Sequence, residues 1–495
     1  MDHLKQFPVR GYCLDLRVQV LTPTALAALA RDLAAWNMNT LLVEYEATYP
    51  YERHGALPNR YAYTRSELRA FLELCGRLRL DVIPLQQSFG HVEYILRHER
   101  YAHLREEASD VSQLCPLQVD AAGDLLSDLL TDMAALHSSE YMHVGGDETY
   151  LLGHCPRCAE FARRHGKSRL YVDHMKRICD IVIGLGRRPV LFADMVLRHP
   201  EALPALPPET ILQDWNYGWG PSSASDVSAL RDTGLEIWGM PSIRCAPDSY
   251  QGTRWEGHLK NLRDYIPRSR SAGYAGMILS SWSYQGECGY EWESRARLLE
   301  LHGFGRRYPT SGFRLAMDAF ARTLGSTTPI RPADVACDYA RDRFGLTATE
   351  ARRFWRVLQL DSTPAEALGR GKRRDPRLVL HQALGARRTL AALQPRRHRD
   401  EFEHFRLMTD LTVQRLRLMV IERQVHSAGF TSARRSRAAR KLTELLVDAE
   451  ALDRRFVQLN TGYLHPAELA EENRRRNRPL HLLYDRMAGS RGAHG

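Results

Sequence analysis

Short apolar runs alternate with amphipathic segments between residues 9 and 306. The apolar runs are the candidate strands, and they span residues 9–16, 40–45, 81–85, 141–144, 189–192, 210–215, 235–239 and 274–280. Segments 23–36 and 66–79 have helical periodicity, and Thr22 and Pro23 supply the N-cap and first-turn residues of the first helix. Eight strand-helix units predict an α/β fold of the TIM (β/α)8 barrel type. A doubly wound sheet is the alternative, because alternation by itself does not show that the sheet closes.

Beyond residue 313 the strand pattern gives way to long, charged, leucine-rich segments. Apolar residues recur there every three to four positions over residues 332–343, 347–358, 378–393, 401–425 and 433–459. This periodicity predicts an all-α helical bundle. Segment 361–375 contains proline and glycine among basic residues and is predicted to be a loop. We therefore expect a catalytic barrel over 1–310, a helical domain over 311–487 and a disordered tail over 488–495.

Composition is that of an ordinary soluble globular protein. The 495 residues are 44% hydrophobic and 26% charged. No run approaches the roughly 18 to 20 apolar residues of a membrane span, and residues 1–6 contain no apolar signal core. Nine scattered cysteines do not form a disulfide framework pattern. We expect a cytoplasmic protein without a membrane partner, and the sequence leaves open whether two copies form a homodimer.

The formal net charge is +10, which raises the question of an anionic partner. The excess is concentrated late in the chain, in the arginine-rich segments 370–374, 434–437 and 474–476, where acidic residues are interspersed. We favour a solvated helical surface over a specific polyanion site. No zinc-finger, RNA-recognition or helix-turn-helix pattern accompanies the charge, so nucleic acid is not an expected partner.

Residues 140–150 carry the most specific pattern in the chain. They read Glu-Tyr-Met-His-Val-Gly-Gly-Asp-Glu-Thr-Tyr, so a short apolar strand ends in two glycines and delivers Asp147 and Glu148 side by side. An isolated Asp-Glu pair is usually a solvated turn. Here the pair follows a strand, which is how a parallel barrel presents catalytic groups at its carboxyl face.

Groups suited to binding a sugar lie near other candidate strands as well. Carboxylates and guanidinium groups bind hydroxyls through charge-assisted hydrogen bonds, while indole rings stack on the apolar face of a pyranose. The set comprises Arg10, Glu44, Glu46, Tyr49, Tyr51, His91, Glu93, Asp194, Asp214, Trp215, Tyr217, Trp238 and Trp282. Their distribution predicts polyol recognition, although the tryptophans could instead belong to the barrel core, and for Trp238 the two readings are equally supported.

Over residues 9–300 the chain resembles family 20 glycoside hydrolases, the β-N-acetylhexosaminidases. Their signature, His-x-Gly-Gly-Asp-Glu, matches residues 143–148, and the segments 44–51, 61–67, 88–93 and 102–106 resemble the hexosaminidase D type. The resemblance implies an exo-acting retaining enzyme, free of cofactor and catalytic metal, whose substrate is a glycan with terminal N-acetylgalactosamine or N-acetylglucosamine. In this family the substrate's own acetamido group attacks the anomeric carbon, so one carboxylic acid suffices as the proton donor.

The resemblance also implies roles for individual residues. Glu148 would be the general acid and then the general base, and Asp147 would hold and polarise the acetamido N–H. Substrate-binding roles fall to Arg10, His91, Asp194, Trp215, Tyr217, Tyr250 and Trp282. Of these, Arg10 and His91 would bind hydroxyls, Trp215 and Trp282 would form walls, and Tyr217 or Tyr250 would donate to the acetamido oxygen.

Two departures from the family pattern concern the choice of sugar. Relatives often have Trp-Asp-Asp after strand five, where this chain has Phe192, Ala193 and Asp194. Secreted relatives place a glutamate where this chain has Tyr284, and Glu287 could substitute from a displaced position. Another retaining glycosidase, or a sugar-binding scaffold without turnover, remains an alternative function.

A lone Cys-x-x-Cys at Cys155 and Cys158 allows three interpretations. The cysteines are ordinary loop residues, a zinc clip completed by His154 or by distant cysteines, or a redox pair. We favour ordinary loop cysteines, because structural zinc needs four ligands and no second pair is evident.

Overall fold

The computed structural model describes residues 6–17, 19–218, 227–245, 248, 253–282, 290–291, 302–303, 310–360, 375–428 and 430–488. Contacts between Cα atoms divide the chain into two compact units. The first comprises residues 1–243, 260–304 and 320–329, and the second comprises residues 244–259, 305–319 and 330–495.

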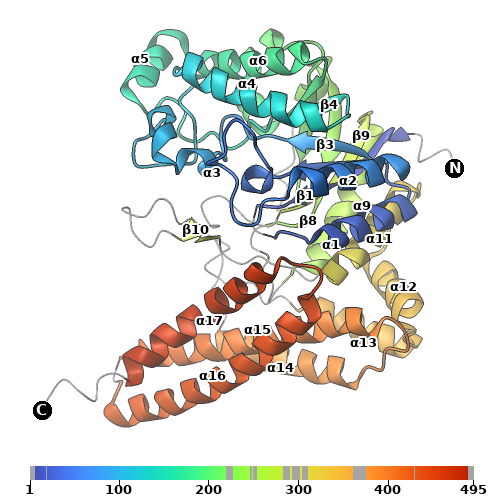
Figure 1. The fold of residues 1–495 in the computed structure, drawn as a ribbon. Coiled ribbons are helices and arrows are strands. Elements are labelled where there is room, and N and C mark those ends of the chain that lie inside the picture. The colour runs from blue at the N-terminus through green and yellow to red at the C-terminus, as the bar shows by residue number, and fades with distance from the viewer. Residues whose placement is uncertain are drawn as a thin grey trace, which may run out of the picture. The chain divides into compact units, whose positions relative to one another are not determined.

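Eight parallel strands form a closed barrel in the first unit (Figure 1). They are β1 (Val9–Asp15), β2 (Thr40–Glu44), β3 (Asp81–Leu85), β4 (Tyr141–His143), β5 (Arg188–Phe192), β6 (Ile211–Trp215), β7 (Glu236–Met240) and β9 (Gly276–Ser281). Pairing of β1 with β9 closes the sheet, with Gly11 opposite Ile278. This closure confirms the barrel and excludes the doubly wound alternative. All eight predicted strands are present, with ends displaced by at most two residues.

Three further short strands lie outside the barrel ring. β8 (Ser242–Arg244) lies at the end of the sheet order, next to β9. The strands β10 (Tyr290–Glu291) and β11 (His302–Gly303) pair with each other in antiparallel fashion.

Helices connect the barrel strands, as the predicted alternation requires. The connecting elements are α1 (Pro23–Ala35), η2 (Glu46–Thr48), α2 (Arg65–Arg77), α3 (Glu93–Leu96), η3 (Glu99–Leu104), α4 (Val119–Leu136), α5 (Pro156–His165), α6 (Lys167–Gly184), α7 (Asp194–Arg198), η4 (Pro200–Ala205), α8 (Val227–Arg231) and α9 (Trp255–Ser271). Local sequence sets where the helices begin. Thr22 caps α1 by accepting the Ala25 N–H, and Thr64 with Glu67 forms a reciprocal capping box on α2.

Apolar side chains from alternate strand positions fill the barrel interior. The core cluster comprises Cys13, Leu42, Ile83, Leu85, Val190, Phe192, Ile211, Trp238, Met240 and Ile278. Side chains alternate between the two faces of a strand, so residues two positions apart point the same way. Counting from a core residue by twos toward the carboxyl end therefore gives the other side chains that point into the barrel. The same alternation selects the residues of the candidate site.

The second unit is predominantly helical among its described residues, as predicted. Its helices include α12 (Pro332–Phe344), α13 (Ala348–Leu358), α14 (Pro376–Ala392), α15 (Arg399–Val425), α16 (Ser432–Asn460) and α17 (Pro466–Ala488), while α11 (Thr310–Leu324) spans the boundary between the units. Buried Leu418, Leu442, Leu480 and Leu483 join α15, α16 and α17 into one core. The sequence pattern did not predict α17, whose apolar positions are interrupted by an arginine run and by Pro479.

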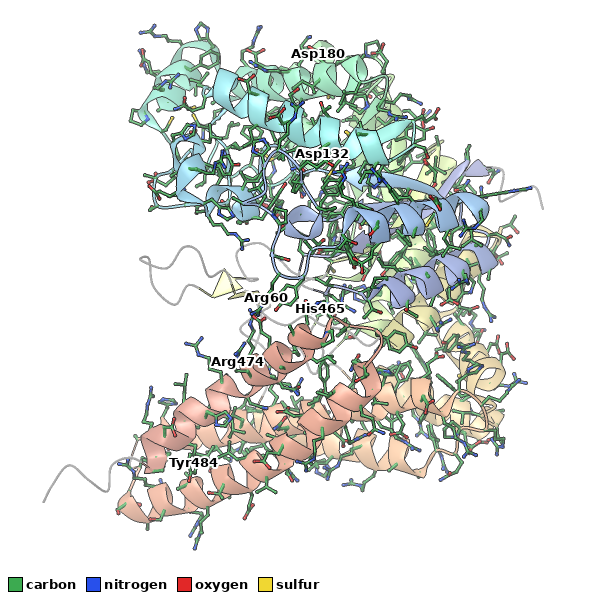
Figure 2. The ribbon with its side chains drawn as sticks, in the orientation of Figure 1. Arg60, Asp132, Asp180, His465, Arg474 and Tyr484 are labelled. Atoms are coloured by element: carbon green, nitrogen blue, oxygen red, sulfur yellow. The ribbon has the colours of Figure 1, made fainter. Side chains whose placement is uncertain are left out.

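Many arginines of the second unit have acidic or carbonyl partners. Arg455 lies 2.6 Å from Asp410, and Arg476 lies 2.6 Å from Asp453. Arg435 donates to the carbonyl oxygens of Arg486 and Met487, which caps the C-terminal end of α17. Ion pairs thus neutralise part of the arginine charge on the predicted solvated helical surface, from which exposed Arg474 projects (Figure 2).

Two predicted segments fall wholly or mostly outside the described residues. Loop 361–375 is described only at Asp375, the N-cap of α14. Ala488, which the predicted tail included, is the last residue of α17, and residues 489–495 are outside the description. Within the described part of the chain, no helix combines the length and apolar character needed to cross a bilayer.

Candidate active site

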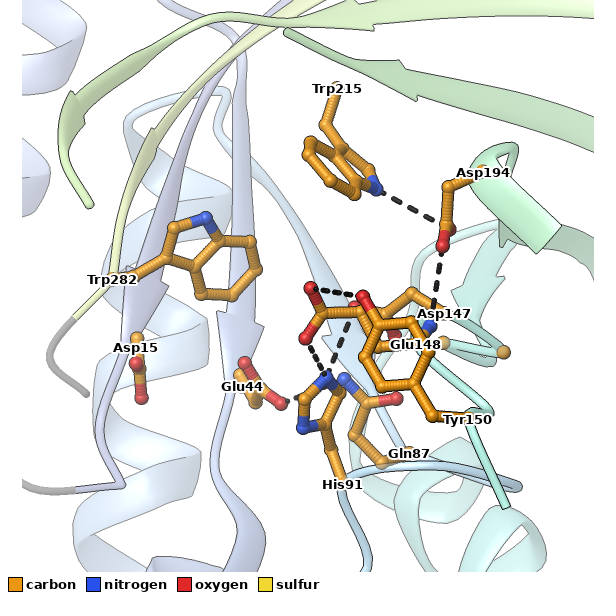
Figure 3. A network of polar contacts seen from close by, with 12 residues as sticks. Asp15, Glu44, Gln87, His91, Asp147, Glu148, Tyr150, Asp194, Trp215 and Trp282 are labelled. Atoms are coloured by element: carbon orange, nitrogen blue, oxygen red, sulfur yellow. Dashed lines mark hydrogen bonds and ion pairs between the residues drawn. The ribbon is translucent and has the colours of Figure 1, made fainter. Parts of the chain in front are cut away.

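The carboxyl ends of the barrel strands bring polar and aromatic side chains toward a common space (Figure 3). Continuing each strand in steps of two from its core residue selects the inward positions. The resulting set is Asp15 at the end of β1 and Arg17 after it, Glu44 on β2, Gln87 after β3, Asp147 after β4, Asp194 after β5, Trp215 on β6 and Trp282 after β9. The site therefore draws on seven of the eight barrel strands.

Two glycines after β4 give the backbone the path that the acidic pair requires. Gly145 and Gly146 have φ of 67° and 87°, the left-handed region that favours glycine. A Cβ on Gly145 would lie 1.8 Å from Gln87 Oε1, and one on Gly146 would lie 2.6 Å from Leu191 Cδ1. Tyr171 donates to the Gly146 carbonyl over 3.0 Å. Both positions thus exclude any larger residue, which explains the Gly-Gly before Asp147.

His143 fixes the strand just before these glycines. Its Nδ1 accepts the Gly145 N–H over 3.0 Å, so its Nε2 carries the proton and donates to Gln213 Oε1 over 2.8 Å. Burial lowers the pKa of His143 to about 4. This histidine is therefore neutral and structural.

His91 lies between the two carboxylates of the acidic pair. Its Nε2 is 3.4 Å from Asp147 Oδ2 and 3.2 Å from Glu148 Oε2. Burial opposes a charge on His91, but the two adjacent carboxylates raise its pKa well above the usual value. The ring is therefore an imidazolium that holds Asp147 and Glu148 together.

Close packing fixes the position of His91. A Cβ on the preceding residue, Gly90, would lie 2.5 Å from the Asp147 carbonyl oxygen. The backbones of the loops after β3 and β4 are therefore in direct contact. His91 itself has a φ of 55°, a conformation that side-chain-bearing residues adopt at a cost of order 1–3 kcal/mol. The contact with the acidic pair offsets this strain.

Asp147 and Glu148 differ in environment although they are neighbours. Burial opposes ionisation of Asp147, but His91 lowers its pKa below the usual value. Asp147 Oδ1 is buried and has no hydrogen-bond partner among the described residues. The Glu148 side chain is 33% exposed and accepts a hydrogen bond from the Tyr150 hydroxyl over 3.1 Å. One carboxylate is thus a buried anionic acceptor, and the other is accessible for proton exchange.

Asp194 supports the acidic pair from β5. Its Oδ2 accepts the Glu148 N–H over 3.3 Å, and its Oδ1 accepts Trp215 Nε1–H over 3.4 Å. Burial and the neighbouring charge of Asp147 raise the pKa of Asp194 to about 7. Asp194 therefore orients the Glu148 backbone and the Trp215 ring.

Arg17 forms the centre of a second charged cluster after β1. Its guanidinium binds Asp15 through two hydrogen bonds of 3.0 Å and lies 3.3 Å from Glu44 Oε2 and 3.7 Å from Glu46 Oε1. Burial raises the pKa of Glu44 to about 7, with Arg17 opposing the shift. The Arg17 guanidinium lies 5.5 Å from the Trp282 ring centroid. This arrangement offers donors and acceptors beside an aromatic face.

Three aromatic side chains border the site. The Trp215 and Tyr217 rings stack with centroids 5.1 Å apart, and Trp282 Nε1 donates to the Tyr217 hydroxyl over 2.6 Å. The predicted residues Trp215, Tyr217 and Trp282 thus come together.

The structure corrects the placement of Arg10. It is the second residue of β1, at the amino end of the barrel, where its guanidinium donates to the carbonyl oxygens of Phe7 over 2.8 Å and Asn37 over 3.2 Å. The site lies at the opposite end of the strand. Arg17, which the sequence reasoning missed, is the arginine of β1 that reaches the site.

Several other predicted sugar-binding groups are buried and packed or hydrogen-bonded elsewhere in the barrel unit. Trp238 belongs to the barrel core, with no exposed surface. Asp214 is also buried and accepts the hydroxyls of Tyr265 and Tyr274, each over 2.8 Å. The hydroxyl of buried Tyr49 donates to the Asp132 carbonyl, and that of buried Tyr51 donates to Gln86. Tyr250, Tyr284 and Glu287 lie outside the described residues.

Asp15, Gln87 and Tyr150 were also missed as individual site residues. The signal for Asp15 was the alternation along β1, since Asp15 lies two residues beyond core Cys13 whereas Arg10 lies on the other face. Tyr150 is 50% exposed and contacts Glu148, but local sequence carries no sign of this contact.

Together the groups form an ionised buried acceptor, an accessible carboxyl group and an aromatic border. This combination suits acid catalysis on a polyol with one further polar substituent. The geometry places the predicted residues Asp147, Glu148, His91, Asp194, Trp215, Tyr217 and Trp282 at one end of the barrel.

Comparison with known proteins agrees with this chemistry. The sequence model described as "Glycosyl hydrolase family 20, catalytic domain" matches residues 7–237. Hexosaminidase D from Bos taurus is 31% identical over 268 residues, which cover 50% of this chain and 76% of the bovine protein. Hexosaminidase D from Homo sapiens is 30% identical over 297 residues, which cover 56% of this chain and 60% of the human protein.

Solved structures of β-N-acetylhexosaminidases are also similar to the chain. The β-N-acetylhexosaminidase from Bacteroides fragilis NCTC 9343 is 18% identical, with a TM-score of 0.46 over 65% of this chain and 72% of that chain. The assignment depends on the sequence relatives. Because the bovine relative is covered over most of its length and the family model spans both Asp147 and Glu148, the chain belongs to glycosyl hydrolase family 20.

Proposed function

We propose that this glycoside hydrolase is an exo-acting, retaining β-N-acetylhexosaminidase that releases terminal N-acetylgalactosamine or N-acetylglucosamine from a glycan. The names of the bovine and human relatives support the activity. The observation that carries the proposal is the unequal pair after β4, in which Asp147 is buried with a free acceptor and Glu148 is accessible.

Asp147 anchors the substrate's acetamido group in this proposal. Its unpartnered Oδ1 is the acceptor that an acetamido N–H would satisfy, and its lowered pKa keeps it anionic. An anion at the N–H increases electron density on the acetamido oxygen, which attacks the anomeric carbon as the glycosidic bond breaks. The same anion stabilises the cationic oxazolinium that forms.

Glu148 moves the proton. It protonates the departing glycosidic oxygen in the first step, and in the second step it accepts a proton from the water that opens the oxazolinium ring. The Asp194 contact to the Glu148 N–H and the Tyr150 hydroxyl support its orientation. His91 is a positioning residue, because it contacts both carboxylates and holds their spacing.

The remaining groups serve substrate recognition in this proposal. Arg17 with Asp15 and Glu44 binds ring hydroxyls, the role that the sequence resemblance implied for Arg10. Trp215 and Trp282 border the sugar. Tyr217, whose oxygen accepts the Trp282 N–H, donates to the acetamido oxygen, the role that the sequence resemblance implied for Tyr217 or Tyr250.

A panel of nitrophenyl glycosides tests the proposal. We expect hydrolysis of the N-acetylgalactosamine and N-acetylglucosamine derivatives and strong inhibition by a thiazoline that mimics the cyclic intermediate, since a site complementary to the transition state binds such mimics tightly. Equal turnover of galactosides or glucosides without the acetamido group, without thiazoline inhibition, would instead indicate a glycosidase with a carboxylate nucleophile. No turnover of any glycoside would favour a sugar-binding scaffold.

The Asp147→Asn variant separates anchoring from acid catalysis. Removing the anionic support of the oxazolinium should lower kcat by roughly 10²-fold, with a smaller change in KM. Single-turnover and steady-state measurements on the same acetamido substrate supply both values. Unchanged kcat would contradict the anchoring role.

We also propose that the protein works in a reducing compartment. Support comes from the described cysteines, none of which is joined in a disulfide in the described part of the chain, even though the Cys115 and Cys158 sulfurs lie 3.5 Å apart. Fractionation of the native host checks this, and recovery of the protein in the secreted fraction would contradict it.

A further inference from the structure

A second cluster of reactive side chains lies outside the active site, in the barrel unit. It consists of Glu106, Cys115, Cys155 and Cys158, whose ligand atoms all lie within 4.8 Å of one another. Cys115 Sγ is 3.5 Å from Cys158 Sγ and 3.8 Å from Cys155 Sγ. Three residues of the cluster are buried, and Cys155 is partly buried. Tertiary structure thus supplies Cys115 as a third thiol beside the Cys-x-x-Cys.

The sulfur spacing fits a tetrahedral metal site. With Zn–S bonds of about 2.3 Å, tetrahedral geometry separates the sulfurs by about 3.8 Å. A disulfide would require an S–S distance of about 2.05 Å, far shorter than either measured spacing. The two sulfur spacings therefore match those of ligands around one metal ion, and metal analysis distinguishes this site from a reduced redox pair.

Glu106 supplies the fourth ligand atom. Its Oε1 accepts the Cys155 N–H over 3.0 Å, whereas its Oε2 is buried and has no hydrogen-bond partner among the described residues. Leaving a carboxylate oxygen unpaired in a buried position is costly. A cation bound to Oε2 removes this cost, and carboxylate oxygen is an accepted zinc ligand.

Backbone structure also prepares the cluster for thiolates. Cys155 is the N-cap of α5 and accepts the Cys158 N–H over 3.3 Å, with Pro156 in the first turn. A helix N-terminus and a backbone N–H at sulfur both favour the thiolate form, which is the form that binds metals.

A second group of buried candidate ligands lacks these features. Cys245, Asp248 and His258 offer only three ligand atoms. Both Asp248 oxygens are already hydrogen-bonded, to the N–H groups of Arg254 and Cys245 and to His258. This group is a satisfied polar network.

We propose that Glu106, Cys115, Cys155 and Cys158 bind one Zn²⁺ ion in a closed structural site. The site joins two segments of the barrel unit. One is the segment between β3 and α4, which also contains His91, and the other is the β4–α5 loop with the start of α5, which also contains Glu148. The same two segments meet where Gln113 accepts the Leu151 N–H over 2.9 Å. The zinc ion therefore fixes the scaffold behind the acidic pair and takes no part in bond cleavage.

Metal analysis of the full-length protein, purified without metal-affinity resin, tests the proposal directly. We expect about one zinc ion per chain, as for a closed structural site, and visible d–d absorption typical of tetrahedral cobalt thiolate after growth in cobalt-supplemented medium. Stoichiometric iron would overturn the choice of metal. Metal-free protein with a Cys155–Cys158 disulfide, or with all thiols titrating freely, would overturn the site.

Substitutions then assign the ligands. Glu106→Gln keeps the acceptor for the Cys155 N–H but removes the anionic Oε2 ligand, so zinc should be released faster to a chromogenic chelator. The double variant Cys155→Ser/Cys158→Ser should lose zinc and unfold at a lower temperature, because metal binding is coupled to folding. The control is Cys75→Ala, a buried thiol outside the cluster that should leave the zinc content unchanged.

The readouts are independent of glycosidase activity. Zinc release from Glu106→Gln at the wild-type rate would exclude Glu106 as a ligand even if the double variant failed to fold. Zinc content and cobalt spectra can be measured whether or not the chain hydrolyses any glycoside, so failure of one proposal is distinguishable from failure of the other.

Discussion

The two ends of the barrel differ in whether their polar side chains have hydrogen-bond partners within the protein. At the amino end, Arg10 donates to backbone carbonyls, Asp81 accepts the Ser139 hydroxyl over 2.8 Å, and Arg188 pairs with Glu236 over 3.0 Å. These groups have partners within the protein. They stabilise the strand starts.

At the carboxyl end, buried acceptors remain unsatisfied. Gln87 Oε1 and Asp147 Oδ1 have no hydrogen-bond partner among the described residues, and His91 and Glu148 both have positive φ. Each unmade hydrogen bond costs roughly 1–3 kcal/mol. Such costs persist where the substrate supplies the missing donors, so the comparison locates function at this end of the barrel.

The largest expected effect on activity comes from Glu148, and Glu140 on the other side of β4 supplies the control. Glu148→Gln should reduce kcat/KM for an unactivated disaccharide by roughly 10²- to 10⁴-fold, because general acid assistance is lost. Aryl glycosides with good leaving groups should be less affected in the first step. Steady-state kinetics on both substrates measure the difference.

Glu140→Gln is the matched control, since Glu140 is exposed and immediately precedes β4. It should hydrolyse the disaccharide at the wild-type rate. Wild-type turnover of the disaccharide by Glu148→Gln would remove Glu148 from the acid role.

An intermediate effect on activity is expected from comparing Arg17, which follows β1, with Arg10, which lies near its start. Arg17→Met should lower kcat/KM by roughly 10- to 10²-fold, since it removes charge-assisted hydrogen bonds worth about 1.5–3 kcal/mol. Arg10→Met should leave kcat/KM unchanged and lower Tm, because the Arg10 guanidinium donates to the backbone carbonyls of Phe7 and Asn37 at the amino end of the strand. Loss of kcat/KM in Arg10→Met but not in Arg17→Met would show that Arg10, and not Arg17, is the arginine of the active site.

The smallest effect is a pH-dependent change in stability at Asp194. Its raised pKa, about 7 in the folded chain against an ordinary value near 3.8, means that ionisation destabilises the fold. The stability present below pH 4 is lost as pH rises through 7. Asp194→Asn removes this loss, so its Tm relative to wild type should increase between pH 4 and pH 7 and then level off.

Thermal unfolding across this pH range checks the Asp194 prediction. Asp180→Asn on the exposed face of α6 is the control, and its Tm difference from wild type should stay constant, because an exposed ion pair contributes little. A Tm difference for Asp194→Asn that is independent of pH would show that the pKa of Asp194 is the same in the folded and the unfolded chain.

Local sequence predicted much of the fold because each strand and most helices are set by nearby residues. The apolar runs gave all eight barrel strands, and Thr22 and Pro23 gave the start of α1. Asp147 and Glu148 were predictable for the same reason, since the required Gly145 and Gly146 directly precede them. α17 was missed because arginines interrupt its apolar face.

The sequence by itself determined the strand-helix alternation and the acidic pair, both of which depend on short-range periodicity and backbone conformation. Only the tertiary structure decided that β1 pairs with β9, that Arg17 rather than Arg10 meets Glu44, and that Cys115 joins Cys155 and Cys158. The physical reason is that barrel closure and loop packing join residues distant in the chain, and the direction in which a side chain points depends on its strand register rather than on its immediate neighbours.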